Sequence, residues 1–118
     1  MECQNANERK SIFKTVDLGQ SKFMNINFEE SLFDDVNFDG CKFEKANFLN
    51  TEISHAYFWD TKIIDASFQR GLMENVDLSS MTLKEVNLAN TVIEDAYIEG
   101  LIINGVDVGK LIASQSKE

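Results

Sequence analysis

A five-residue rhythm in the N-terminal half of the chain decides the fold. Residues 21–50 read SKFMN INFEE SLFDD VNFDG CKFEK ANFLN, with a phenylalanine in the third place of every unit. All nine phenylalanines of the chain lie at positions ending in 3 or 8. A period of five is neither the 3.6 of an α-helix nor the 2 of an ordinary β-strand, so the pattern predicts a repeat architecture.

The rhythm continues through most of the chain with other apolar residues. From residue 13 to residue 108, all twenty third places hold a large apolar side chain, without insertion or deletion. The residue two places earlier is usually small, and the residue between them is usually polar. Each unit therefore points a small and a large side chain inward, and we expect a bend every five residues that turns the chain before a conventional strand forms. The absence of proline suits an unbroken ladder of backbone hydrogen bonds.

The units VNFDG, CKFEK, ANFLN, VDLSS and VNLAN resemble the pentapeptide-repeat family, whose unit is roughly A(D/N)LXX. The resemblance covers residues 11–110. It implies an all-β fold, a right-handed quadrilateral parallel β-helix with four units per coil, and hence twenty units in five coils. We expect residues 1–10 to form a polar N-terminal tail or cap. Residues 111–118 are expected to form a C-terminal cap, with a short helical turn as one form of it.

Two finer patterns concern polar residues. In alternate units the residue before the large one is Asn or Asp at seven of ten positions, and we expect these short side chains to bond to nearby backbone and support a turn. In the other units the small inward residue is often Ser, Thr or Cys. Such buried groups need a partner, and a backbone carbonyl of the neighbouring coil is the expected one. Cys41 belongs to this series, which favours a core residue over a nucleophile.

Acidic residues dominate the surface charge. The chain has 118 residues, enough for one domain, and a formal net charge of −9. Folded at a period of twenty, two adjacent faces hold eleven acids and one base, Lys14, whereas the other two faces are close to neutral. The acids of these two faces supply a candidate partner surface. It consists of Asp34, Asp35, Asp39, Asp60, Glu74, Glu94, Asp95 and Glu99.

Apolar and aromatic residues at outward positions supply two further candidate contacts. Those beside the acidic faces are Leu32, Leu72, Val92, Tyr57, Trp59 and Tyr97. Aromatic residues near acids suit protein contacts, and the open alternative is that these side chains stack along the ladder or are covered by neighbours. Ile102, Leu111 and Ile112 are candidates at the C-terminal end. The resemblance implies a homodimer through this end, and a simple end cap in a monomer is the alternative.

Nothing in the sequence favours catalysis. The one histidine, His55, has no visible constellation of partners, and no cofactor or metal site is expected. The sequence favours a non-catalytic structural or protein–protein interaction module with an unknown protein partner. The resemblance implies an alternative, an acidic rod that mimics DNA and binds DNA gyrase or a related topoisomerase, as quinolone-resistance pentapeptide proteins do.

The composition also bears on the surroundings of the protein. An acidic chain is not expected to bind nucleic acid directly, because phosphates repel it. No stretch has the roughly 18 apolar residues of a membrane span, and residues 1–10 lack the apolar core of a secretory signal. With two cysteines, Cys3 and Cys41, a reducing compartment is the simpler interpretation. We therefore expect a cytoplasmic protein that does not contact membranes.

Overall fold

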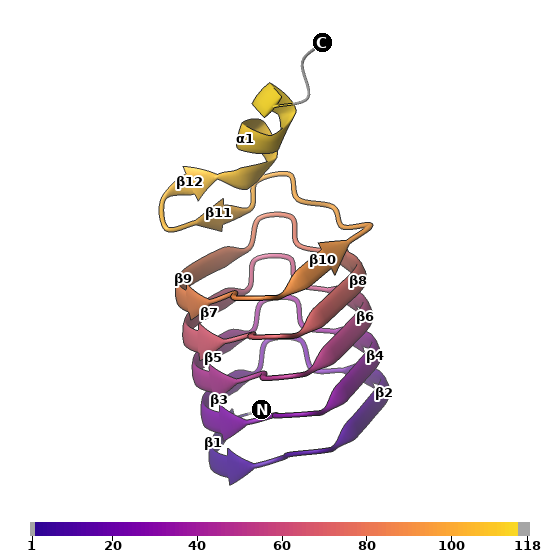
Figure 1. Cartoon of the computed structure of the whole chain (residues 1–118). Helices are drawn as coiled ribbons and strands as arrows, with labels where there is room; N and C mark the ends of the chain where they lie inside the picture. The colour runs from indigo at the N-terminus through magenta and orange to yellow at the C-terminus, as the bar shows by residue number, and fades with distance from the viewer. Residues whose placement is uncertain (1, 116–118) are drawn as a thin grey trace.

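The computed structural model describes residues 2–115 and shows a parallel β-solenoid of about five turns (Figure 1). One side of the solenoid, here called sheet A, contains the odd-numbered strands. They are β1 (Glu2–Asn7), β3 (Lys22–Asn27), β5 (Lys42–Asn47), β7 (Lys62–Ser67), β9 (Thr82–Asn87) and β11 (Ile102–Ile103). The opposite side, sheet B, contains the even-numbered strands as far as β10. They are β2 (Ile12–Asp17), β4 (Leu32–Asn37), β6 (Glu52–Tyr57), β8 (Leu72–Asp77) and β10 (Val92–Glu94).

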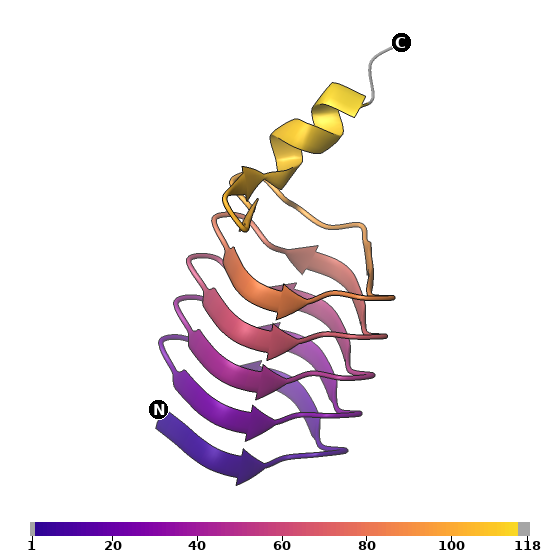
Figure 2. The ribbon, with the colours of Figure 1, turned by 60° about the vertical axis from the view of Figure 1, so that its left-hand side comes forward.

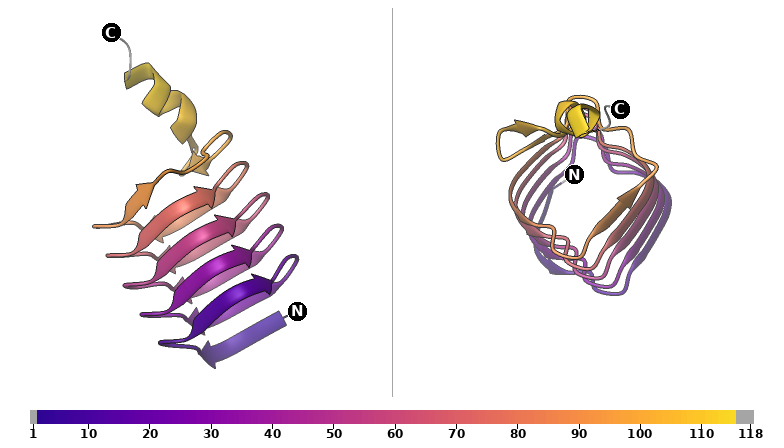
Figure 3. Two further views of the ribbon diagram at one scale, coloured as in Figure 1. Left: turned by 90° about the vertical axis from the view of Figure 1, so that its right-hand side faces the viewer. Right: turned by 45° about the horizontal axis from the view of Figure 1, so that its top comes forward.

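Equivalent residues of successive coils lie twenty positions apart. Phe23 of β3 is opposite Phe43 of β5, which is opposite Ile63 of β7. This register confirms four five-residue units per coil, and the view along the axis shows a four-sided cross-section (Figure 3). The molecule measures 47 × 25 × 21 Å, so stacked coils make a short rod.

The four corners of each coil are made by residues with left-handed backbone. Every fifth residue from Asn5 to Gly100 has a positive φ, and only two of these twenty are glycine. Nine are Asn or Asp, the side chains that tolerate this region best. Thr15, with φ 54°, is the β-branched exception. The repeated strain is compensated by the coil-to-coil ladder on both sides of each corner.

Alternate corners differ in the way the chain passes them. Corners at positions ending in 5, from Asn5 to Glu85, lie inside six-residue strands, whereas Asp95 follows the three-residue strand β10. In β2, the residues on both sides of Thr15 pair with β4, and only Thr15 itself is skipped. The expectation that each bend would end a strand was therefore wrong at these corners. A single left-handed residue redirects the chain while its neighbours keep their hydrogen bonds to the next coil.

The remaining corners are hydrogen-bonded turns, and most of them are supported by the side chain that precedes the turn. Asn27 Oδ1 accepts the amide N–H of Glu29 at 2.9 Å, and Asn37 Oδ1 accepts that of Asp39 at 2.8 Å. Asp17, Asn47, Asp77 and Asn87 form the same bond. This confirms the turn-supporting role expected for the alternate Asn and Asp residues and explains the period of ten.

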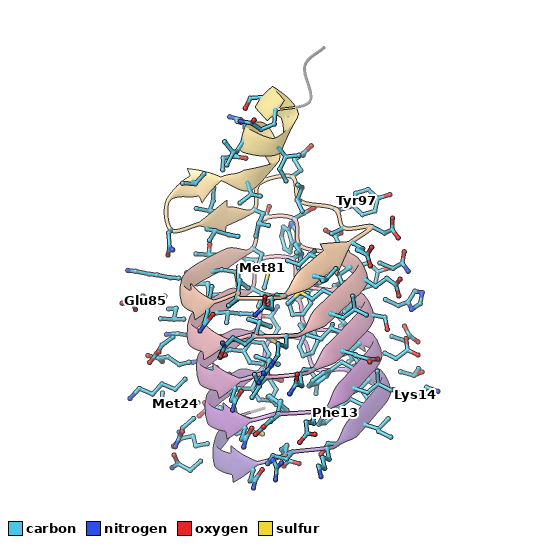
Figure 4. All side chains as sticks on the ribbon, viewed as in Figure 1. Phe13, Lys14, Met24, Met81, Glu85 and Tyr97 are labelled. Atoms are coloured by element: carbon cyan, nitrogen blue, oxygen red, sulfur yellow. The ribbon has the colours of Figure 1, made fainter. Side chains whose placement is uncertain are left out.

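Columns of stacked side chains fill the solenoid. The rings of Phe48 and Phe68 stack at 4.6 Å between centroids, and those of Phe38 and Phe58 at 4.7 Å. Inward residues such as Met81 and outward residues such as Lys14 separate clearly in Figure 4. Each ring thus contacts its equivalent in the adjacent coil, at about the strand spacing of 4.8 Å.

Buried polar groups bond to the neighbouring coil, as the sequence predicted. Thr51 Oγ1 donates to the carbonyl of Phe28 at 3.0 Å, and Thr61 Oγ1 donates to that of Phe38 at 2.8 Å. The Cys41 thiol makes the equivalent contact. Burial raises the pKa of this thiol from 9.0 to about 11, which agrees with its interpretation as a core residue.

The N-terminal end extends the repeat. Strand β1 pairs in parallel with β3, with Glu2 opposite Lys22 and Asn7 opposite Asn27. Residues 2–7 therefore belong to the first coil and are not a free tail. They leave the apolar end of the core partly open, and Phe13 is only half-buried.

The C-terminal end leaves the solenoid at residue 104. Asn104 and Gly105 both have positive φ, and this tight turn reverses the chain into strand β12 (Val106–Asp107), antiparallel to β11. Helix α1 (Val108–Gln115) follows, with Asp107 Oδ1 accepting the Lys110 amide at its start. Residues 106–110, expected as the last repeat unit, therefore leave the coil. No residue of α1 is buried, and the helix projects along the rod axis (Figure 2).

Candidate functional site

A groove of about 560 Å³ lies on sheet B and spans four successive coils. Its floor is made by Ala56 and Val76. One rim consists of corner residues, twenty positions apart: Asp35, His55, Asn75 and Asp95. The other rim consists of Tyr57, Asp77 and Tyr97, and Asp34 lies beside the first rim. We call this feature the sheet B groove.

The corner rim is held outward by its backbone. Its four residues have φ between 52° and 58°, so each projects from an edge of the coil. Asp34 Oδ1 lies 3.2 Å from His55 Nδ1 of the next coil, a contact that becomes an ion pair when the imidazole is protonated. His55 is well exposed, so this contact orients the ring without removing it from solvent.

The tyrosine rim occupies positions that support turns elsewhere. Tyr57 lies opposite Asp77 in the ladder, and Asp77 lies opposite Tyr97. A tyrosine cannot accept the amide two residues later, and at the first of these positions the Trp59 N–H instead donates to Asp39 Oδ1 of the preceding coil, at 2.9 Å. Tyr57 and Tyr97 are 55% and 75% exposed, so their rings add nothing to the core.

The structure brings only some of the predicted acids together. Asp34, Asp35 and Asp95 line the groove. Glu74 of β8 lies opposite Glu94 of β10, and neither residue belongs to the groove lining. The other predicted acids lie in the turns that follow sheet B strands, outside the groove lining. They are Asp39, Asp60 and Glu99.

The predicted apolar contacts separate into three places. Leu32, Leu72 and Val92 form one column of sheet B, with Glu52 between the two leucines. The leucines are half-buried, which agrees with partial covering by neighbours, whereas Val92 is exposed. Trp59 is exposed in a turn outside the groove. Only Tyr57 and Tyr97 join the acids.

The C-terminal candidates lie apart from the groove. Ile102 is half-buried in β11, and Leu111 and Ile112 are half-exposed on α1. Val108 at the start of α1 packs against the core, whereas the rest of the described helix points away from the last coil (Figure 2). Of the cap expected at residues 111–118, residues 116–118 lie outside the part of the chain that the structure describes.

Three rim residues of the groove, His55, Asn75 and Asp77, are not among the partner-surface residues that the sequence predicts, and neither are the floor residues Ala56 and Val76. The signal was available in the period of twenty, because positions 35, 55, 75 and 95 form one column and positions 57, 77 and 97 another. What the period does not show is that these two columns border a hollow.

Part of the sequence matches a known family of repeats. A model of pentapeptide repeats, in nine copies, matches residues 28–71. Residues 28–71 of the chain are therefore pentapeptide repeats. No curated protein matches its sequence. No helix within residues 2–115 of this pentapeptide-repeat protein is long and apolar enough to cross a membrane.

Solved pentapeptide-repeat structures show the same fold. A protein from the thylakoid lumen of Arabidopsis thaliana has a TM-score of 0.76 at 18% identity, over 94% of this chain and 79% of its own. HetL, involved in heterocyst differentiation regulation in the cyanobacterium Nostoc sp. strain PCC 7120, has a TM-score of 0.51 at 12% identity, over 86% of this chain and 51% of its own. At these identities the likeness concerns the fold alone.

Proposed function

We propose that this pentapeptide-repeat protein is a non-catalytic binding module whose sheet B side recognises a basic surface on a protein partner. The observation that carries the proposal is the segregation of charge. The two faces of sheet B, with their corners, hold eleven acids and one base. Sheet A instead carries a ladder of three lysines in register, Lys22, Lys42 and Lys62.

A rigid solenoid makes such a charge pattern effective. The carboxylates are fixed at the coil spacing, so little conformational entropy is lost when a partner binds. An acidic face also attracts a basic partner before contact, in a salt-dependent way. The exposed tyrosines among the acids suit a protein surface, where aromatic side chains contribute much of the contact energy.

A matched pair of charge reversals tests the proposal. Asp35→Lys with Asp95→Lys alters two exposed corners of sheet B, and Asp65→Lys with Glu85→Lys alters two exposed corners of sheet A. All four residues have φ between 52° and 58°, and both variants change the net charge equally. We expect proteins retained from a cell extract by the wild type to be lost with the sheet B variant and kept with the sheet A variant. Equal retention by both variants would overturn the proposal.

A second candidate function is DNA mimicry toward DNA gyrase or a related topoisomerase. The charge density of sheet B favours it: ten net negative charges over five coils of about 4.8 Å give one charge per about 2.4 Å. Duplex DNA carries one per about 1.7 Å. The same two variants apply, with supercoiling by purified gyrase as the readout. Unchanged supercoiling and quinolone poisoning in the presence of micromolar wild-type protein would exclude this function and leave the first.

We further propose a homodimer through the C-terminal end. Helix α1 buries none of its own residues, and Leu111 and Val106 are 49% and 47% exposed. A second copy would cover them. We expect light scattering to give twice the chain mass of 13.4 kDa for the wild type and the single mass for Leu111→Asp. A wild-type mass of 13.4 kDa would contradict the dimer.

The proposed compartment is the cytoplasm. Cys3 and Cys41 are both free thiols, which suits a reducing environment. There, an acidic module meets many basic protein surfaces, and its partner is selected by the groove as well as by charge.

A further inference from the structure

We infer that the sheet B groove binds an arginine side chain of the partner, with the guanidinium between Tyr57 and Tyr97 and above Asp77. The inference rests on the proposed function and specifies the chemistry of its partner. The occupant is an extended, arginine-bearing segment that lies along the groove.

The first argument is the departure of the two tyrosines from the turn chemistry of their column. The equivalent positions in the column are Asp17, Asn37 and Asp77, and each accepts the amide two residues later. Tyr57 gives up this bond, and Asp39 replaces it from the preceding coil. A residue that departs from the local turn chemistry without improving the packing of the core is typical of a functional site. Here the departure places two exposed aromatic rings on one rim of the groove.

The second argument is the spacing of the rings. Tyr57 and Tyr97 are two coils apart, about 9.6 Å at the usual strand spacing. A planar group that contacts a ring on each side, at 3.5–4.0 Å per contact, needs about 7–8 Å. Asp77 lies between the two tyrosines in the column, so their rings do not stack on each other. The two rings would need to incline slightly toward each other, because the spacing of about 9.6 Å exceeds the 7–8 Å that a sandwiched planar group requires. Tyr97 projects freely from the side of the rod (Figure 4).

The third argument is charge. Asp77 Oδ1 accepts the Ser79 amide at 2.9 Å, which fixes the carboxylate beneath the space between the rings. Asp35 and Asp95 lie on the opposite rim, and both are exposed. This combination favours a cation with flat faces. A guanidinium stacks on aromatic rings and donates two parallel hydrogen bonds to a carboxylate, whereas a lysine ammonium is compact and strongly hydrated.

The test uses three capped heptapeptides with the same glycine spacers. They carry arginine, lysine or citrulline at positions 2, 4 and 6, and binding to the full chain is measured by calorimetry. We expect the arginine peptide to bind about five-fold or more tightly than the lysine peptide. Citrulline keeps the planar shape without the charge, and this peptide should show no measurable binding.

Variants of the tyrosine rim keep the fold intact. Tyr57→Asn and Tyr97→Asn install the residue that Asn37 presents in the same column, so the turn bond can form. Each should weaken the arginine peptide about five-fold or more, and the double variant should remove its preference over lysine. Asp77→Asn preserves the turn acceptor and removes the charge, and it should also weaken binding. Circular dichroism confirms that each variant is folded.

The outcomes separate this inference from the proposed function. Equal binding of the arginine and lysine peptides, unchanged by Tyr57→Asn and Tyr97→Asn but lost in the Asp35→Lys, Asp95→Lys variant, would overturn the inference and leave the proposed function standing. Binding unaffected by that charge-reversal variant would count against both. Asp65→Lys with Glu85→Lys is the control that should leave peptide binding unchanged.

Discussion

Replacement of Phe38 by alanine is expected to lower the free energy of unfolding by about 3–5 kcal/mol. The Phe38 side chain is fully buried. Its ring stacks on Phe58 at 4.7 Å and contacts the rings of Phe33 and Phe43 at 5.3 and 5.7 Å. The substitution leaves a cavity that the coils above and below cannot fill, because backbone hydrogen bonds between coils hold them in place. Urea unfolding followed by circular dichroism measures the change.

Phe13→Ala is the matched control. Phe13 belongs to the same type of column and stacks on Phe33 at 4.7 Å, but it lies at the open N-terminal end and is only half-buried. Its loss should therefore cost less than half of the Phe38 effect. Equal losses at both positions would mean that burial in the middle of the rod does not determine the stability of these columns.

Removal of one whole coil is expected to leave a folded, shorter solenoid. Deletion of residues 42–61 joins Cys41 to Lys62, which takes the column position of Lys42. β7 then pairs with β3, and β8 with β4, in unchanged register. Because each coil contacts only its neighbours, the variant should unfold cooperatively at a lower urea concentration than the wild type.

Deletion of one residue more should have a much larger effect. Without residues 42–62, Ile63 takes the outward position of Lys42, and every later large side chain is displaced by one residue. A one-residue shift moves inward side chains to the opposite face of a strand. We expect the cooperative transition to be lost or confined to the N-terminal coils. If both deletions unfold alike, register along the column is not what holds the coils together.

The local chemistry of the repeat was readable from the sequence. The alternation of small and large apolar residues predicted the inward columns, and Asn27 and Asn37 support turns as expected. The hydroxyls of Thr51 and Thr61 find the predicted carbonyls in the neighbouring coil. These features follow from the sequence because each depends on residues a fixed distance apart, two for a turn and about twenty for a coil.

The groove depends on relations that the period alone does not show. Asp35 and Tyr57 belong to different columns of side chains. Because Asp35 lies at a left-handed corner, its side chain projects in another direction than that of Tyr57, and the groove lies between the two columns. The same applies to His55, whose contact with Asp34 joins two adjacent columns in successive coils. The sequence indicated an acidic side with aromatic residues beside it, but not the hollow that Tyr57 and Tyr97 share with Asp35 and Asp95.

The five-residue period by itself determined which side chains face the core, since it runs without insertions. The resemblance of its units to pentapeptide repeats added the four-sided coil, and with it the segregation of charge between faces. Only the tertiary structure decided where the solenoid starts and ends and where its surface is hollowed. Residues 2–7 join the first coil because the edge of β3 offers backbone partners to a polar strand. Asn104 and Gly105 end the last coil because two successive left-handed residues reverse the chain, and a periodic pattern of apolar residues continues past them unaltered.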